Sequence, residues 1–422
     1  MSNKLKPCTP EQIEILKKQR FSGTEPGPLL KDFNSLLDFI GKTGIAVSEK
    51  TQLFAMNTLA DINRLLTHPL DVKLKRPVQK SFPYINGLYL LLRSSGLSYV
   101  VPDGKKTKLM LNEEVLADWN KLTPAECYFS LLQAFYYRAD AAMLGERQGF
   151  LSPTCFYDCL LFFQKYLGDR LDVKSHRDTM YMLRFSPGLH NLAVMESFGF
   201  IDIECTVAEE NETWPLSVIK PTDWGRAIFG YFVQNNLFIP FLEDDESDQA
   251  GSGIWEAEFK KYIPEWKRSL LQVERSITEE GAYIFNVSLG EARCKIAVPA
   301  DISLDELAYG ILAAFDFDDD HLYEFIYKNE YGIEESIAHP YADSDHEYCT
   351  DDCPVGYLPL YKGMTFIFHF DFGDDWRFSI QVEALPSAAL DYSELTVIEK
   401  RGTPPQQYPD WEDDYSDDED DD

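Results

Sequence analysis

Residues 282–289, AYIFNVSL, and 294–298, CKIAV, decide the fold of the C-terminal part of this 422-residue chain. Apolar and polar residues alternate in the first stretch, and both are predicted to be β-strands. Ser303 follows, with Glu306 three residues later, a pair that is typical of a capping box at the start of a helix. The apolar spacing of Leu304–Phe315 continues that helix, so two strands lead into one helix.

Three further strands are expected downstream of this helix. One is predicted at Leu322–Tyr327, after an acidic turn, and two more at Met364–Asp371 and Arg377–Ala384, on either side of the turn 372–376. Strands that gather around one helix predict a compact α+β domain, which we place at residues 279–408.

Two motifs stand out in this domain, FDDDHLYEF at residues 317–325 and FHFDFGDDW at residues 368–376. Shorter matches accompany them at Val298-Pro and at Gly402-Thr-Pro-Pro405. Together they resemble the plasmid pRiA4b ORF-3-like family over roughly residues 280–410. The resemblance implies the fold of that family, no established reaction, and a mobile-element context from the labels that its members often carry. The family-motif positions in this chain are Asp318, Asp320, His321, Glu324, Asp371, Gly373, Asp374 and Trp376.

The chain departs from the family pattern at three positions. Phe317 stands where the family often has Trp, and Phe378 stands where it often has His. Gln406 follows the two prolines where the family has an acidic residue. If the family shares a polar site, these changes imply a weaker one here.

Carboxylates gather at residues 316–320 and again at 371–375, and hard cations such as Mg²⁺ favour carboxylate oxygens. A metal-dependent enzyme that uses both clusters is therefore one alternative, and it requires the clusters to converge. Turn chemistry explains the same residues, because Asp and Gly favour tight turns and Trp376 suits a core. An EF-hand is excluded, since His321 stands where its calcium loop needs Gly.

Zinc has only weak candidate ligands in this chain. His346, Cys349 and Cys353 lie close in sequence, but the two cysteines are not spaced as in the usual zinc ribbons. We therefore expect no cofactor.

Charge is divided unevenly along the chain. Residues 1–200 carry 25 Lys and Arg against 20 Asp and Glu, whereas residues 201–422 carry 14 against 51. The resulting net charge of −32 opposes general binding to nucleic acid or to an anionic membrane. Residues 243–253 predict an acidic linker. An amphipathic helix is expected after it, and the two together take up residues 243–278. The acidic block at 409–422 predicts a solvated, disordered tail.

Residues 1–242 are expected to be mostly helical, because several stretches have 3.6-residue apolar spacing. Two places, at about 80–135 and about 185–235, share a further order: helix, Gly, strand, polar turn, strand, helix. Winged helix-turn-helix units have this order, so the region is predicted to contain two winged-helix-like units.

A winged helix that binds DNA needs cations on its recognition helix or on its wing. The second unit carries Glu204, Glu209, Glu210 and Glu212 around its wing, which predicts a structural or protein-binding role. The first unit and the stretch before it offer cations for possible DNA contact. These residues are Lys73, Lys75, Arg76, Lys80, Lys105, Lys106 and Lys108.

Membrane segments, signal peptides and disulfides can also be judged from the sequence. No stretch reaches the roughly 18 apolar residues of a membrane helix, and the N-terminal residues lack the apolar core of a signal peptide. Eight cysteines in 422 residues predict a reduced, cytoplasmic protein without a disulfide framework.

The leading functional hypothesis is a non-enzymatic interaction or regulatory protein. Its expected partner is another protein with a basic surface, and it is not expected to bind a membrane. The first alternative is a DNA-associated regulator, linked to mobile elements, that uses the winged-helix-like N-terminal region. The second is the metal-dependent enzyme.

Overall fold

The computed structural model of the chain describes residues 5–103, 106–146, 154–166, 168–173, 177–210, 213–237, 255–270, 280–329, 332–342, 348–387, 390 and 392–408. The chain forms two units, which we call the N-terminal unit (Met1–Glu274 with Glu330–Ile333) and the C-terminal unit (Arg275–Asn329 with Glu334–Asp422). The predicted linker 243–253 and acidic tail 409–422, and also Lys105 and His346, lie outside the described residues.

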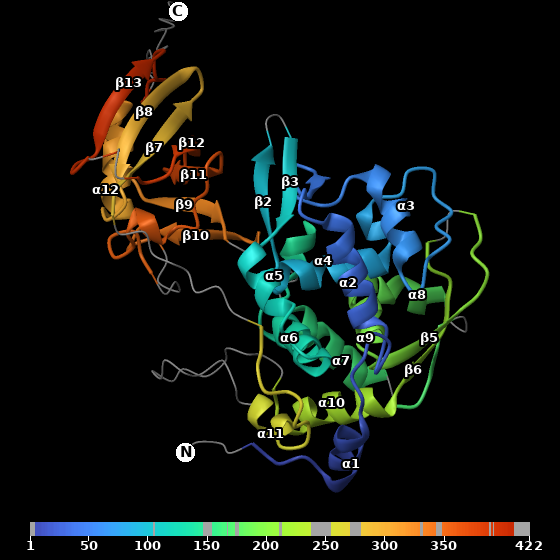
Figure 1. Cartoon of the computed structure of the whole chain (residues 1–422). Coiled ribbons are helices and arrows are strands. Elements are labelled where there is room, and N and C mark those ends of the chain that lie inside the picture. The colour runs from blue at the N-terminus through green and yellow to red at the C-terminus, as the bar shows by residue number, and fades with distance from the viewer. Residues whose placement is uncertain are drawn as a thin grey trace, which may run out of the picture. The chain divides into compact units, whose positions relative to one another are not determined.

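The N-terminal unit is mostly helical, as its apolar spacing predicts (Figure 1). Its first half runs through α1 (Pro10–Lys18), α2 (Leu29–Ile40), β1 (Ile45–Val47), α3 (Met56–Leu65), η1 (Gln79–Ser81), α4 (Pro83–Ser94), β2 (Ser98–Asp103), β3 (Lys106–Leu111) and α5 (Glu113–Trp119). Its second half runs through α6 (Pro124–Tyr137), η2 (Ala141–Leu144), α7 (Cys155–Tyr166), β4 (Leu171–Asp172), α8 (Arg177–Leu183), α9 (Leu189–Ser197), β5 (Ile201–Cys205), β6 (Leu216–Pro221), α10 (Asp223–Gln234) and α11 (Glu256–Lys260).

One order of elements occurs twice in this unit. The series α2, β1, α3, α4, β2, β3 is matched by α7, β4, α8, α9, β5, β6. The strands form two antiparallel three-stranded sheets, ordered β1-β3-β2 and β4-β6-β5, so the last strand lies in the middle each time. The short strands β1 and β4 were not predicted, because three and two residues are too few to show a period of two.

Helices α4 and α9, which hold the same place in the two series, pack against each other. All twelve residues of α4 are buried, as expected for a helix that is apolar on every side. The contact is close at Gly87, where an added Cβ would lie 2.7 Å from Val194 Cγ2 and 3.1 Å from the carbonyl oxygen of His190. A residue with a side chain would therefore separate the two helices.

The segment after the linker completes the core of the N-terminal unit. Within the described residues 255–270, only Glu256–Lys260 is helical, because Pro264 cannot continue the helix predicted through this region. Trp255 and Trp266 are nevertheless buried, and the Trp266 ring stacks on Phe129 with 4.0 Å between ring centroids. The predicted apolar face is thus buried, although most of the segment is not helical.

The C-terminal unit is a sheet covered by one helix, and this matches the predicted α+β class. Its elements are β7 (Ala282–Leu289), β8 (Ala292–Pro299), α12 (Leu304–Ala314), β9 (Tyr323–Lys328), β10 (Glu334–Ala338), η3 (Val355–Tyr357), β11 (Thr365–Phe370), β12 (Trp376–Ala384) and β13 (Thr396–Arg401). The predicted capping box is present, since the Glu306 amide donates to Ser303 Oγ (3.1 Å) and the Ser303 amide donates to Glu306 Oε2 (3.0 Å).

Seven antiparallel strands form this sheet in the order β10-β9-β11-β12-β7-β8-β13. Alternate side chains, among them Phe285, Phe368 and Ile380, share one core with Leu307 and Ile311 of α12. The other face carries mostly polar residues, such as Ser288, Lys295 and Gln381, with a few apolar side chains and the buried His369 among them. Within the described parts of both units, no helix is long and apolar enough to cross a membrane.

Candidate functional site

The two family-like motifs meet because strands β9 and β11 pair. In their antiparallel register His369 is opposite Glu324 and Phe370 is opposite Tyr323. The Asp371 amide, just beyond β11, donates to the carbonyl of Leu322 over 3.0 Å. The acidic turn before β9 and the turn between β11 and β12 therefore lie at the same end of the sheet.

Asp371 organises the turn between β11 and β12. Its Oδ1 accepts hydrogen bonds from the amides of Gly373 (2.9 Å) and Asp374 (3.3 Å), and its carbonyl accepts one from the Asp375 amide (2.8 Å). Asp371 and Asp375 both have left-handed backbones, at φ 53° and 56°. The other carboxylate oxygen of Asp371 lies 3.4 Å from His321 Nε2, which is also 3.7 Å from Asp320 Oδ1. The two carboxylate clusters thus meet at His321.

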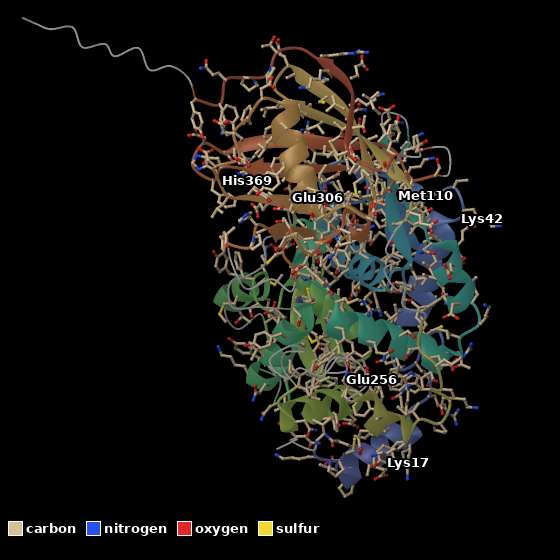
Figure 2. All side chains as sticks on the ribbon, turned by 90° about the vertical axis from the view of Figure 1, so that its left-hand side faces the viewer. Lys17, Lys42, Met110, Glu256, Glu306 and His369 are labelled. Atoms are coloured by element: carbon tan, nitrogen blue, oxygen red, sulfur yellow. The ribbon has the colours of Figure 1, made fainter. Side chains whose placement is uncertain are left out.

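His369, which was not predicted as a site residue, is a buried member of this cluster (Figure 2). Its Nδ1 lies 3.0 Å from Glu324 Oε1. Its Nε2 lies 2.9 Å from Asp375 Oδ1, although that pair is not aligned as a hydrogen bond. Arg377 Nε contacts the same Asp375 oxygen at 2.7 Å. The sequence shows only a histidine between two phenylalanines of a predicted strand. Its site role could not be predicted from this, because its partners are brought to it by strand pairing.

The end of the described chain folds back onto the acidic turn. Gln407 accepts a hydrogen bond from the Asp318 amide (2.6 Å) and donates to the Asp318 carbonyl (3.3 Å). The Tyr408 hydroxyl lies 2.7 and 2.8 Å from the two oxygens of Asp320. This hydrogen bond lowers the pKa of Asp320 and raises the pKa of Tyr408 to about 12. Neither Gln407 nor Tyr408 was predicted as a site residue.

Two of the three departures from the family pattern, Phe317 and Phe378, are core residues, whereas Gln406 is exposed. Phe317 packs edge-on against Trp376 and Phe378, with ring centroids 5.2 and 5.5 Å apart, and Phe378 is fully buried. An apolar contact therefore stands where a family histidine would place a polar group.

The cluster joins three segments through turn hydrogen bonds and ion pairs. All eight family-motif residues lie at or beside these two turns.

Among the described residues, no group of three or more His, Cys, Asp or Glu side chains is arranged to hold a metal ion. Of the zinc candidates, Cys353 is buried and Cys349 is partly exposed, and neither joins such a group.

The described candidates for DNA contact lie in two places, the loop before α4 and the β2–β3 hairpin. Three of them are paired at 2.5–2.9 Å: Lys73 with Asp71, Lys80 with Glu146, and Lys108 with Asp103. Lys75, Arg76 and Lys106 are exposed. The helix α4 between the two places offers no exposed cation, because its only basic residue, Arg93, is 3% exposed.

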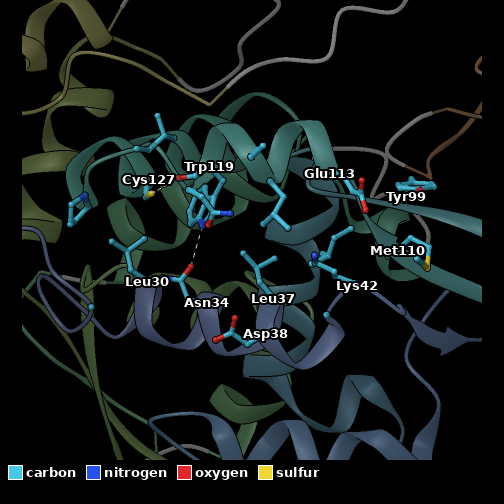
Figure 3. Close-up of a pocket in the computed structure, with 18 residues that line it drawn as sticks. Leu30, Asn34, Leu37, Asp38, Lys42, Tyr99, Met110, Glu113, Trp119 and Cys127 are labelled. Atoms are coloured by element: carbon cyan, nitrogen blue, oxygen red, sulfur yellow. Dashed lines mark hydrogen bonds between the residues drawn. The ribbon is translucent and has the colours of Figure 1, made fainter.

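A groove of about 840 Å³ opens in the N-terminal unit between helices α2 and α5 (Figure 3). Leu30, Leu37 and Trp119 line its apolar part, and Trp119 Nε1 donates to Asn34 Oδ1 over 3.1 Å across it. The hairpin residues Tyr99 and Met110 close one end. The groove was not predicted, because its walls come from segments that are far apart in sequence.

Three charged residues also line this groove. Asp38 and Glu113 supply two carboxylates, and Lys42 supplies one ammonium group. All three are exposed, and no ion pair within the described residues involves them. The groove therefore combines an apolar floor with unpaired charges at its rim, mostly acidic.

The fold and the polar cluster define the C-terminal unit as an α+β domain in which two spaced motifs are joined at one end of an antiparallel sheet. The family model described as plasmid pRiA4b ORF-3-like protein matches residues 282–411. The C-terminal unit is therefore a pRiA4b ORF-3-like domain, as the motifs predicted.

Among solved structures, the chain is similar to a protein of unknown function, MM3350 from Methanosarcina mazei Go1. The two share 24% sequence identity over 29% of this chain and 71% of that chain, with a TM-score of 0.25. No curated protein matches the chain.

Proposed function

We propose that the chain is a non-enzymatic interaction protein whose N-terminal unit receives a segment of a partner protein in the groove between α2 and α5. The observation that carries this proposal is the groove itself, which is large, partly apolar and open at a rim of unpaired charges. Amphipathic segments bind in such grooves through apolar anchors, and charges at the rim set the orientation.

The polar cluster of the C-terminal unit supports a structural role for its motif residues. Asp371 is held by turn amides, Asp320 by Tyr408, and His369 lies between Glu324 and Asp375. A catalytic carboxylate or histidine needs a free oxygen or nitrogen directed at a substrate. Asp371 Oδ1, Asp320 and His369 Nδ1 already have partners, whereas the buried His369 Nε2 has no aligned hydrogen bond. Because the described residues offer no group of side chains arranged to hold a metal ion around this nitrogen, the metal-dependent enzyme is the weaker alternative.

The repeated order of elements supports two winged-helix-like units, in which α4 and α9 occupy the place of recognition helices. Recognition helices must enter the major groove of DNA. Here α4 is wholly buried and packs against α9, as Gly87 and Val194 show. The pair therefore favours a protein-binding scaffold, and a DNA-associated regulator linked to mobile elements would have to rely on exposed loop cations such as Lys75 and Arg76.

The chemistry of the partner follows from the groove. Asp38 and Glu113 outnumber Lys42 at the rim, and the floor offers Leu30, Leu37 and Trp119. A segment with apolar residues one helical turn apart and Lys or Arg beside them complements this surface. All eight cysteines are free thiols, which supports a cytoplasmic location.

Random peptides displayed on phage, selected on the full chain, test the proposal. We expect enriched sequences to carry apolar residues at i and i+3 or i+4 with basic neighbours. Their affinity, measured by fluorescence anisotropy, should fall about tenfold on the double variant Asp38→Lys/Glu113→Lys, because two attractive charges become repulsive.

The matched control is Glu49→Lys, which reverses an exposed acidic residue outside the groove lining. It should leave the affinity within about twofold, since it changes only the net charge. Selection of no peptide that depends on the groove, or equal losses in the control and the double variant, would contradict the proposal.

A further inference from the structure

A second cavity of the N-terminal unit lies between the two repeated series of elements. Its volume is about 410 Å³, and its lining comes from the first turns of α4 and α9, the loop before α4, and the segments next to α8, η2 and β6. The lining residues that carry the inference are Val78, Lys80, Glu146, Arg184, Phe185 and His190.

We infer that this cavity is a binding site for a small organic anion, with an apolar body and one carboxylate or phosphate group. The site is separate from the α2–α5 groove and does not depend on the proposed partner. Its volume falls in the usual range for small-molecule sites, which are mostly apolar with a few placed polar groups.

Buried polar side chains line the interior of the cavity. His190 is 8% exposed and Asn86 is 2% exposed. His190 Nε2 lies 3.8 Å from the thiol of Cys155, and no described residue hydrogen-bonds the other ring nitrogen. Burial lowers the pKa of His190 to about 4, so its ring is neutral near pH 7 and offers one donor and one acceptor. A neutral, incompletely partnered imidazole in a cavity is suited to a ligand hydrogen bond.

Apolar side chains stand at the mouth of the cavity. Val78 is 58% exposed and Phe185 is 70% exposed, which is high for residues of this size and polarity. A ligand with an apolar body would cover both side chains. These two residues therefore form the part of the site that contacts the uncharged body of the ligand.

The positive charge of the site comes from Arg184 and from the N-terminus of α9. Lys80 is compensated, because it lies 2.8 Å from Glu146. Arg184 is exposed and has no ion pair among the described residues. Helix α9 begins at the cavity with Leu189 and His190 and has no side-chain cap, so its first amides lack that partner. Helix N-termini attract anions, and here this one adds to Arg184.

Thermal unfolding of the full chain with small probes tests this inference. The probes are phenyl phosphate and phenylacetate, with benzyl alcohol as the neutral analogue and inorganic phosphate as the anion without a body. One or both organic anions should raise the melting temperature by at least about 2 °C at saturating concentration, and the other two should not. Phenyl phosphate and phenylacetate also distinguish a phosphate site from a carboxylate site.

Variants locate the effect. Arg184→Glu and Val78→Asp both change exposed residues at the rim, so the fold should persist, and each should abolish the shift. Arg20→Glu reverses an exposed cation outside the lining and should keep it. The inference is overturned if neither organic anion shifts the melting temperature, if benzyl alcohol acts equally, or if Arg20→Glu loses the shift as Arg184→Glu does.

Discussion

Gly87 is the residue that lets α4 and α9 cross at short distance. Replacing it with alanine would place Cβ within 2.7 Å of Val194 Cγ2. We expect Gly87→Ala to lower the free energy of unfolding of the N-terminal unit by about 1–3 kcal/mol, because the methyl group overpacks a filled contact. Urea unfolding followed by tryptophan fluorescence measures this, since Trp119, Trp224 and most other tryptophans belong to this unit.

Gly168→Ala is the matched control for that variant. A Cβ at Gly168 would meet no atom within 4 Å, so its effect should stay within about 0.5 kcal/mol. Equal destabilisation by both variants would mean that α4 and α9 do not pack closely at Gly87.

Glu196 makes the stability of the N-terminal unit depend on pH. Burial raises its pKa from 4.5 to about 7, and the side chain accepts hydrogen bonds from Tyr84 and from the Ile203 amide. The folded state therefore binds a proton more tightly than the unfolded state does. The stabilisation is complete below pH 4.5 and is lost as the pH rises through 7.

We expect Glu196→Gln to remove this pH dependence. Relative to the variant, the wild-type chain should lose up to about 3 kcal/mol of unfolding free energy between pH 4.5 and pH 8, at about 1.4 kcal/mol per pKa unit. Urea unfolding across this range measures it. Parallel pH profiles for the two proteins would show that Glu196 is not buried.

At the scale of elements, the acidic turn before β9 is fixed by the end of the described chain. Gln407 is 6% exposed and makes two hydrogen bonds with the backbone of Asp318. We expect Gln407→Ala to speed hydrogen exchange of the Asp318 amide about tenfold, because the loss of one hydrogen bond costs about 1 kcal/mol or more. Gln406→Ala, at the exposed neighbouring position, should leave this exchange rate unchanged. Exchange that is equally fast in both variants would contradict the pairing.

Elements with a strong local signal were predicted from the sequence, and elements without one were missed. Ser303 and Glu306 mark the start of α12 because a capping box involves only neighbouring residues. Strand β13 was missed because all six of its residues are exposed, so it lacks an apolar alternation. A bulge near Ile398 also interrupts its pairing with β8, and such bulges protect edge strands from further pairing.

The candidate site was predictable only where it coincides with the motifs. The eight family-motif residues were found by their spacing, but His369, Gln407 and Tyr408 join them through contacts between distant segments. The groove and the second cavity depend in the same way on tertiary packing, which a single sequence does not display. The burial of α4 did have a signal, because its middle, Leu88–Leu92, is an unbroken apolar run that covers every side of the helix.

In the whole molecule, the two units are built differently. The C-terminal unit is a pRiA4b ORF-3-like domain whose polar motif joins its own turns. The N-terminal unit repeats one order of elements and buries the two equivalent helices against each other. We therefore propose that this unit meets its partners through grooves and cavities, because the two helices in the place of recognition helices are packed against each other.

Hydrogen exchange of the full chain, measured by mass spectrometry with and without duplex DNA at low salt, decides whether these helices are open to DNA. We expect the amides of α4 and α9 to be strongly protected in the free protein, with no change in protection when DNA is added. Rapid exchange of either helix in the free protein, or protection that arises only when DNA is added, would contradict this expectation.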